Sequence, residues 1–179
     1  MEILHYVSVK LRRIIGAALV ACCALGAAVS TPANALSSKA SVGHAVGAKK
    51  QVLTATPVSA LKSGSVITVS GSGFDPKIGI YVALCVYKGK NKMPTPCGGG
   101  VNTSGKNPAS VWVSSPNHFT PGLAVPFRKG GKFVAKITVG PMIGSIDCRK
   151  VKCVVGTQGD FLNQATRKAD VVIPVVFKK

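Results

Sequence analysis

The sequence predicts an all-β protein: an antiparallel sandwich of roughly seven to nine short strands that follows an export signal. Three observations predict it. Short apolar segments are separated by turns rich in glycine and proline. No stretch after residue 35 keeps the apolar period of a helix for three turns. An even number of cysteines remains after the signal, which favours disulfides in an exported chain.

The first 35 residues are typical of a secretory signal peptide. A basic start that ends at Arg13 precedes the apolar run from Ile14 to Val29, and the small-x-small sequence "ANA" that ends at Ala35 provides a cleavage site. The sequence "LVAC" also resembles a bacterial lipobox, so lipid anchoring at Cys22 is the alternative. We expect a secreted protein that has no transmembrane segment once the signal is removed.

The mature chain divides into a lead-in and one domain. Residues 36–50 are small, polar and basic, which predicts a flexible lead-in. Residues 51–179 have the length of a single domain and carry the strand pattern. "GSVITVSGSGF" (64–74) and "KFVAKITV" (132–139) alternate with period two, which predicts one buried and one solvated face.

Two further segments have predictable places in a sheet. "IYVALCVYK" (80–88) is apolar on both faces, so we expect a central strand. "VVIPVVF" (171–177) contains Pro174, which cannot donate a backbone hydrogen bond and therefore favours an edge strand or a bulge.

The chain is strongly basic. It has 23 Lys and Arg against 5 Asp and Glu, a formal net charge of +18. Removal of the signal takes away three basic residues and Glu2, which leaves 20 against 4, or +16. Such a field attracts polyanions such as DNA, acidic cell-wall polymers and anionic lipid, although a merely solvated basic surface is the alternative. No nucleic-acid-binding motif accompanies the charge.

The cysteines and the basic residues between them raise a separate question. The mature cysteines are Cys85, Cys97, Cys148 and Cys153. Three disulfide pairings are open. The spacing does not match a zinc site, and the mature histidines are only His44 and His118, so we expect no metal. "SIDCRKVKC" (145–153) places three cations close together, and these are the candidates for contact with an anionic partner: Arg149, Lys150 and Lys152.

Catalysis is not expected. General acid–base and nucleophilic catalysis need carboxylates, histidines and a nucleophile held together. The four mature aspartates are scattered, and His118 is the one histidine in the strand-rich region. No phosphate-binding loop is present.

Two aromatic residues could line a binding site. On an extended strand, Tyr87 shares a face with Tyr81 and Cys85. Trp112 shares a face with two serines, which suggests partial exposure. Core packing is the alternative for both.

Three segments together resemble a known family. They are "VLTATPVSALKSGSVITVSGSGFDPKIGIYVALC" (52–85), "GSIDCRKVKCVVGTQGDFLNQ" (144–164) and "ADVVIPVVF" (169–177). The double-glycine turn after a strand and the "DC-x4-C" pair resemble the neocarzinostatin family of secreted actinobacterial chromoprotein apoproteins. The resemblance covers roughly Gln51 to Cys97 and Gly131 to Phe177.

The resemblance implies an immunoglobulin-like sandwich of seven strands with a small two-ribbon subdomain. It also implies the disulfides Cys85–Cys97 and Cys148–Cys153, the second closing a β-hairpin. In antibiotic members, a cleft between sandwich and subdomain holds a DNA-cleaving enediyne chromophore. Carried over, the cleft would lie beside the first disulfide, with Tyr87 stacking on the ligand and Gln158 near the wall. To these residues we add Trp112.

The chain also departs from the family pattern. The connection "GPMIG" (140–144) is short and lacks an aromatic residue, whereas 98–130 is longer than expected and contains His118 and Phe119. The antibiotic members are acidic, and this chain is basic. We therefore expect a monomeric, secreted, non-enzymatic protein that carries a hydrophobic small molecule without covalent attachment. The alternative is a basic secreted or surface protein that binds DNA, cell-wall polymer or anionic lipid without a chromophore.

Overall fold

The computed structural model describes residues 40–102, 104–115 and 122–179. The expected signal peptide with Cys22, and also His118 and Phe119, lie outside the described residues. The described part contains ten strands and no helix long and apolar enough to cross a membrane. The strands are β1 (Gly43–Val46), β2 (Val52–Thr56), β3 (Ser65–Ser72), β4 (Ile80–Val86), β5 (Ser110–Val113), β6 (Phe133–Val139), β7 (Met142–Ile143), β8 (Ile146–Asp147), β9 (Cys153–Gly159) and β10 (Val171–Val175).

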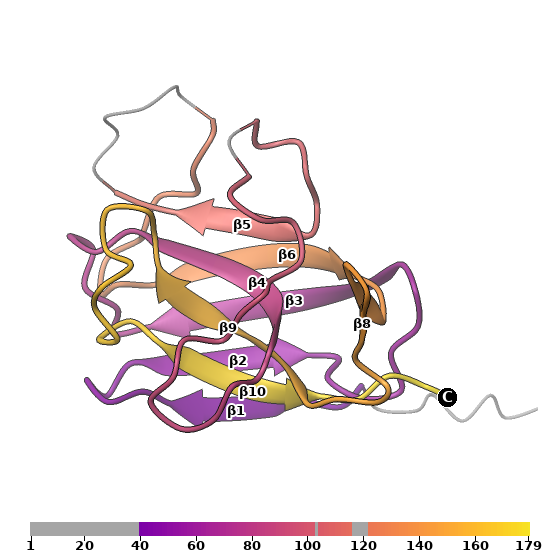
Figure 1. The fold of residues 1–179 in the computed structure, drawn as a ribbon. Helices are drawn as coiled ribbons and strands as arrows, with labels where there is room; N and C mark the ends of the chain where they lie inside the picture. The colour runs from indigo at the N-terminus through magenta and orange to yellow at the C-terminus, as the bar shows by residue number, and fades with distance from the viewer. Residues whose placement is uncertain (1–39, 103, 116–121) are drawn as a thin grey trace, which may run out of the picture. The chain divides into compact units, whose positions relative to one another are not determined.

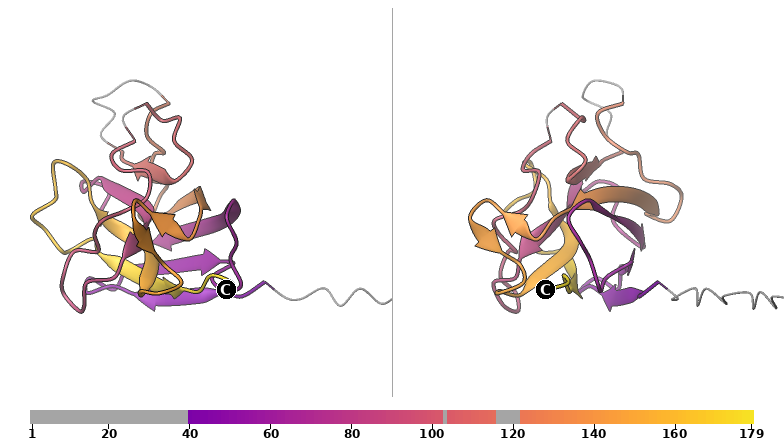
Figure 2. Two further views of the ribbon diagram at one scale, coloured as in Figure 1. Left: turned by 45° about the vertical axis from the view of Figure 1, so that its right-hand side comes forward. Right: turned by 90° about the vertical axis from the view of Figure 1, so that its right-hand side faces the viewer.

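The strands form two four-stranded antiparallel sheets and one short ribbon, which confirms the predicted all-β sandwich (Figure 1). One sheet has the order β1-β2-β3-β6 and the other has the order β10-β9-β4-β5. The ribbon pairs β7 with β8. In the right-hand view of Figure 2 the ribbon lies on the side of β9 that faces away from β1, β2 and β3.

The strand patterns read from the sequence hold in both sheets. Buried and partly or fully exposed residues alternate along β3 and β6, as period two predicts. β4 is central, because β9 and β5 pair with its two edges, and all seven of its residues are buried. β10 with Pro174 is an edge strand. The apolar core therefore lies between the inner faces of the two sheets.

The lead-in prediction is wrong for its described C-terminal part. Gly43–Val46 forms β1, which pairs with β2 along its whole length and raises the number of strands in the two sheets to eight. Ala45 packs against the core. A side chain at Gly43 would overlap the Cγ2 methyl of Ile173 on the opposite sheet, so the glycine lets the strand approach closely. Local composition did not reveal this strand, because its burial depends on β2 and β10.

The two disulfides form as the resemblance implies, but the second does not close a hairpin. Cys85 pairs with Cys97, and Cys148 with Cys153. β8 pairs with β7, whereas Cys148–Cys153 spans the turn that leads from β8 into β9. Both cysteines of this turn belong to the main core. The turn is therefore attached directly to the interior of the sandwich.

Candidate functional site

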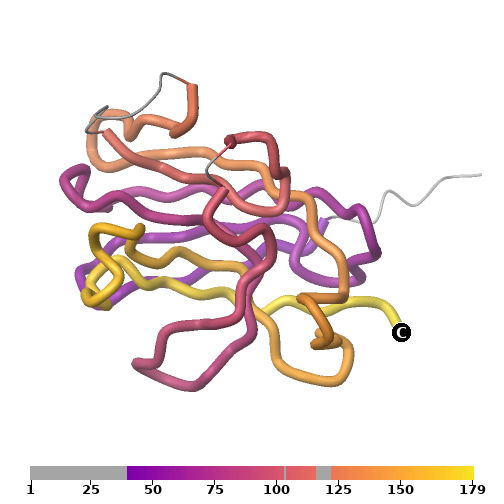
Figure 3. Tube along the Cα trace, turned by 45° about the horizontal axis from the view of Figure 1, so that its top comes forward, coloured from indigo at the N-terminus to yellow at the C-terminus, as the bar shows by residue number. Residues whose placement is uncertain are grey.

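The outer face of the β10-β9-β4-β5 sheet is the candidate site, because its side chains are covered by loops rather than by strands. Along β4, Ile80, Val82 and Leu84 belong to the core between the sheets. The alternate residues Tyr81 and Ala83 point to the outer face, yet they are 5% and 3% exposed. Two irregular segments, residues 87–101 and 160–170, provide this cover. In Figure 3 the first of them and the β7–β8 ribbon project on the same side of the sandwich.

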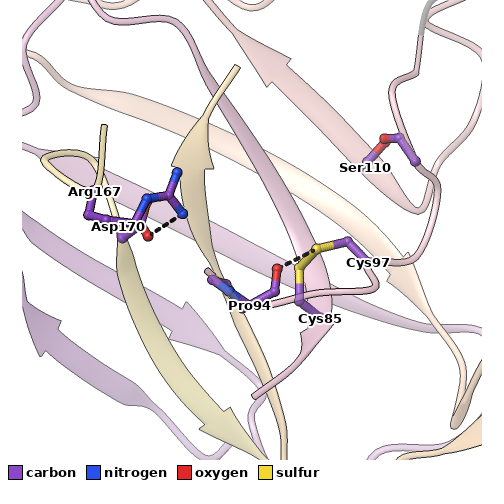
Figure 4. Close-up of a disulfide and its surroundings, with 7 residues drawn as sticks. Cys85, Pro94, Cys97, Ser110, Arg167 and Asp170 are labelled. Carbon is purple, nitrogen blue, oxygen red and sulfur yellow. Dashed lines mark hydrogen bonds and ion pairs between the residues drawn. A yellow bond between two sulfur atoms is a disulfide. The ribbon is translucent and has the colours of Figure 1, made fainter. Parts of the chain in front are cut away.

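The first covering segment is held to β4 by a disulfide and by backbone bonds. The Gly98 N–H donates to the Leu84 carbonyl at 2.8 Å, and the Val86 N–H donates to the Pro96 carbonyl at 3.0 Å. The disulfide lies between these bonds and packs with Ala83 and Val154 in a small separate apolar cluster. Cys97 Sγ lies 3.4 Å from the Pro94 carbonyl oxygen (Figure 4). Residues 95–98 therefore extend the sheet locally, although they form no regular strand.

The second covering segment is held by a buried carboxylate. Asp160 is 1% exposed, and its Oδ2 accepts a hydrogen bond from Trp112 Nε1 at 3.1 Å. Its Oδ1 accepts from the Leu162 N–H at 3.2 Å and from Asn163 Nδ2 at 2.8 Å. A side chain at Gly79 would overlap Oδ2, so a glycine is required where the carboxylate sits. Asp160 therefore positions the loop over the sheet face.

The expectation that Trp112 is partly exposed is wrong. Trp112 is 6% exposed, because the 160–170 loop covers it and the Phe161 ring lies with its centroid 5.8 Å away. The serines on its face are buried as well. Ser110 satisfies its hydroxyl by donating to the Gly100 carbonyl at 3.1 Å. Serine was therefore a misleading sign of exposure at this position.

Two hollows lie at this face, and we name each by one residue. The Gln158 cavity has a volume of about 170 Å³. Its lining residues are Tyr81, Ala83, Thr95, Cys97, Gly100, Val101, Gln158 and Gln164. Gln158 Oε1 is buried and has no hydrogen-bond partner among the described residues. The lining thus combines small apolar residues, Cys97 of the first disulfide and polar side chains, among them Gln158 with its unpaired acceptor.

The Tyr87 groove is the larger hollow, at about 390 Å³. Residues 45–48 of the first sheet's edge line it together with residues from the 87–94 segment and from the end of the 160–170 loop. The side chains that give it its chemistry are Tyr87, Lys90, Lys92, Pro94, Arg167 and Asp170. Arg167 Nη1 lies 2.9 Å from Asp170 Oδ2 (Figure 4).

The structure divides the residues that the sequence singled out. Cys97 and Gln158 line the cavity, whereas Tyr87 lines the groove. Trp112 lies beneath the 160–170 loop and supports it. Sequence reasoning missed Tyr81 as a lining residue, although its outward place on β4 follows from period two. Burial raises the pKa of the Tyr81 hydroxyl, and the negative charge of Asp160 raises it further, so Tyr81 is a neutral phenol at physiological pH.

The three cations of "SIDCRKVKC" have different surroundings. Arg149 forms an ion pair with Asp147, with Nη2 and Oδ2 2.9 Å apart. The side-chain hydrogen bonds from Arg149 lower the pKa of Asp147 to about 2. Lys150 and Lys152 are exposed, and the Lys152 carbonyl accepts a hydrogen bond from the Tyr87 N–H at 2.9 Å. Lys152 is therefore fixed next to Tyr87.

The described residues contain no group of three or more His, Cys, Asp or Glu side chains placed to hold a metal ion. The site thus offers shape, apolar surface, hydrogen-bonding groups and charge. These are means of binding a small molecule.

Comparison with known proteins agrees with the sequence motifs. A search of curated proteins found no match. Among solved structures, macromomycin is similar, with 19% sequence identity and a TM-score of 0.48 over 72% of this chain and 99% of that one. The model of the neocarzinostatin family matches residues 53–174, more than half of the chain. The chain therefore belongs to the neocarzinostatin family.

Proposed function

We propose that the protein is a secreted, non-enzymatic carrier that holds a hydrophobic small molecule in the Gln158 cavity. The observation that carries the proposal is the buried Oε1 of Gln158, which has no hydrogen-bond partner among the described residues and belongs to a residue that lines the cavity. A buried acceptor that lacks a partner costs about 1–3 kcal/mol. A turn of the Gln158 amide towards a ligand hydroxyl or N–H in the cavity would recover that cost.

The size of the cavity limits what it can enclose. Small-molecule sites usually measure about 300–1,000 Å³. At about 170 Å³, the Gln158 cavity would enclose one ring or a short chain, and the rest of the ligand would extend across the rim. Val101 at this rim is 50% exposed and offers apolar surface for that part. Cys97 of the first disulfide also lines the cavity, and a polarisable sulfur there would suit an unsaturated ligand.

The same geometry assigns no chemical step to the protein. Asp160 is occupied by three donors, and Tyr81 has a raised pKa. Any DNA damage of the kind that the resemblance implies for antibiotic members would come from the carried molecule. The role of the chain would be to bind, shield and deliver it.

Native mass spectrometry of the protein purified from its own host tests the proposal. We expect the intact mass to exceed that of the disulfide-bonded chain by one small molecule, which denaturation releases. The variant Gln158→Leu removes the acceptor while keeping most of the volume, and we expect it to lose most of this adduct. Thr54→Val, on the outer face of the other sheet, is the matched control. A protein that carries no adduct in its own host, and a Gln158→Leu variant that retains as much ligand as Thr54→Val, would each contradict the proposal.

A polyanion is the second candidate ligand, and one observation favours it. A backbone hydrogen bond joins Lys152 to Tyr87, so the basic 148–153 turn is attached to the start of the segment that carries Lys90 and Lys92. DNA affinity should then fall steeply between about 50 and 200 mM salt. Binding of an apolar ligand in the Gln158 cavity should hardly change over the same range. A gel-shift titration with duplex DNA that showed no complex at low salt would exclude this second candidate.

A further inference from the structure

We propose that the Tyr87 groove is a second, independent binding site, and that it takes a small aromatic anion. The class includes aryl carboxylates, sulfonates and phosphates. The proposal does not depend on the carrier function of the Gln158 cavity, and it rests on shape, on one aromatic wall and on an excess of positive charge.

The groove has the dimensions of a ligand site. Its volume of about 390 Å³ is more than twice that of the Gln158 cavity and falls in the usual range for small molecules. Val171 and Val172 of β10 and Ala45 of β1 supply apolar surface where the edges of the two sheets meet. Tyr87 and the buried Pro94 add a wall from the covering segment. A flat ring has apolar contacts on several sides here.

The charges that line the groove are mostly positive. Lys90, Lys92 and Arg167 face one carboxylate, that of Asp170. Arg167 pairs with Asp170, and its Nη2 also donates to the Gln164 carbonyl. The two lysines have no acidic partner among the described residues lining the groove. A lining that contains two lysines and one tyrosine is complementary to an anionic group attached to an aromatic ring.

The carboxylate of Asp170 restricts where in the groove a negatively charged group of a ligand is favoured, and that place is near the two lysines. Asp170 Oδ1 is buried and has no hydrogen-bond partner among the described residues, and burial raises the pKa of this group despite the nearby Arg167. A ligand anion placed against Asp170 would be repelled. The anionic group would therefore lie towards Lys90 and Lys92, with the ring against Tyr87 and Val172.

The groove and the cavity are separate. Among the described residues, none lines both hollows. Pro94 belongs to the groove and Cys97 to the cavity, and the contact between Pro94 and Cys97 marks the boundary (Figure 4). Changes in one hollow can thus be tested without direct change to the lining of the other.

The test uses anilinonaphthalene sulfonate, a fluorescent aromatic anion, with the full mature protein. N-phenylnaphthylamine, which has the rings but no charge, is the comparison probe. We expect saturable one-to-one binding of the sulfonate and at least about tenfold weaker binding of the neutral probe. Lys90→Ala with Lys92→Ala should weaken sulfonate binding about fivefold or more. Tyr87→Leu, which keeps apolar bulk but loses the ring, should also weaken it.

The controls separate this site from general charge and from the cavity. Lys62→Ala with Lys136→Ala removes the same charge from exposed positions elsewhere and should leave binding unchanged. An equal loss in both double variants would overturn the proposal in favour of non-specific attraction. Loss of sulfonate binding in Gln158→Leu, but not in the Lys90/Lys92 variant, would overturn it and leave the carrier proposal standing. Binding to phosphatidylglycerol vesicles without any binding of the free sulfonate would also overturn it, because the partner would then be a surface.

Discussion

The two faces of β4 are equally buried but are covered in different ways. On the inner face, Ile80, Val82 and Leu84 pack within the core between the two sheets. On the outer face, Tyr81, Ala83 and Cys85 are covered by irregular segments. Between the two sheets the apolar side chains pack closely, whereas on the outer face a disulfide-held loop and a loop fixed by Asp160 leave two hollows. The inner face thus forms the core of the fold, and the outer face carries the two hollows that we propose as binding sites.

The largest expected effect comes from the inner face. Ile80 is 0% exposed, and Ile80→Ala should lower the free energy of unfolding by about 2–5 kcal/mol, because it removes apolar contacts and leaves a cavity. Val66→Ala, at a 50% exposed position on β3, should change it by about 0.5 kcal/mol or less. Urea denaturation measures both. Similar losses in the two variants would contradict the division between buried and solvated faces.

The next effect concerns the disulfide of the outer face. Replacing Cys85 and Cys97 together by alanine opens a loop with a sequence separation of 12, which should cost about 3 kcal/mol by the chain-entropy model. The same change removes a wall of the Gln158 cavity. Ligand retention should therefore fall at temperatures where the variant is still folded. Normal retention of the ligand in that variant would show that the outer face does not need the disulfide in order to bind.

A smaller effect is expected for the carboxylate that holds the 160–170 loop. Asp160→Asn replaces an acceptor by a donor opposite the N–H of Trp112 or of Leu162, which should cost about 1.5–3 kcal/mol. The chain has one tryptophan, so its fluorescence reports the change directly, and we expect a shift to longer wavelength. The pKa of Tyr81 should also fall, because the charge of Asp160 raises it. Asp75→Asn, in an exposed turn, is the matched control.

The smallest expected effects are those of pH on the stability of the fold, and they run in opposite directions for Asp147 and Asp170. Arg149 lowers the pKa of Asp147 from 3.8 to about 2, so Asp147 stabilises the fold above its unfolded pKa and loses that contribution as pH falls towards 2. Burial raises the pKa of Asp170, so its contribution is present below 3.8 and is lost as pH rises through the folded pKa. Stability measured against pH should therefore decline less steeply in acid for Asp147→Asn than for the parent. Asp170→Asn should remove the loss of stability that the parent shows as pH rises through the folded-state pKa of Asp170. Stability curves of the two variants that coincide with the curve of the parent would contradict both assignments.

Features carried by one segment could be read from the sequence, and features that need several segments could not. β4 and β10 were predictable because a continuous apolar run and Pro174 each determine position locally. The burial of Trp112 was not, since its partner Asp160 lies 48 residues away. β1 was missed because four residues beside glycine and lysine give too weak a pattern. The Tyr87 groove was missed because it joins residues 45–48, 87–94 and 167–172.

Pro174 has a consequence for how this protein behaves at high concentration. An edge strand with free N–H groups is a template for the addition of strands from other molecules, which leads to aggregation. Pro174 has no N–H to offer, and two residues later the Val176 N–H is already bonded to the Val58 carbonyl at 2.9 Å. The edge of β10 is thus poorly suited to pairing with a second chain. The apolar residues that remain exposed, such as Val101, then lie on a protein whose β10 edge does not favour strand addition.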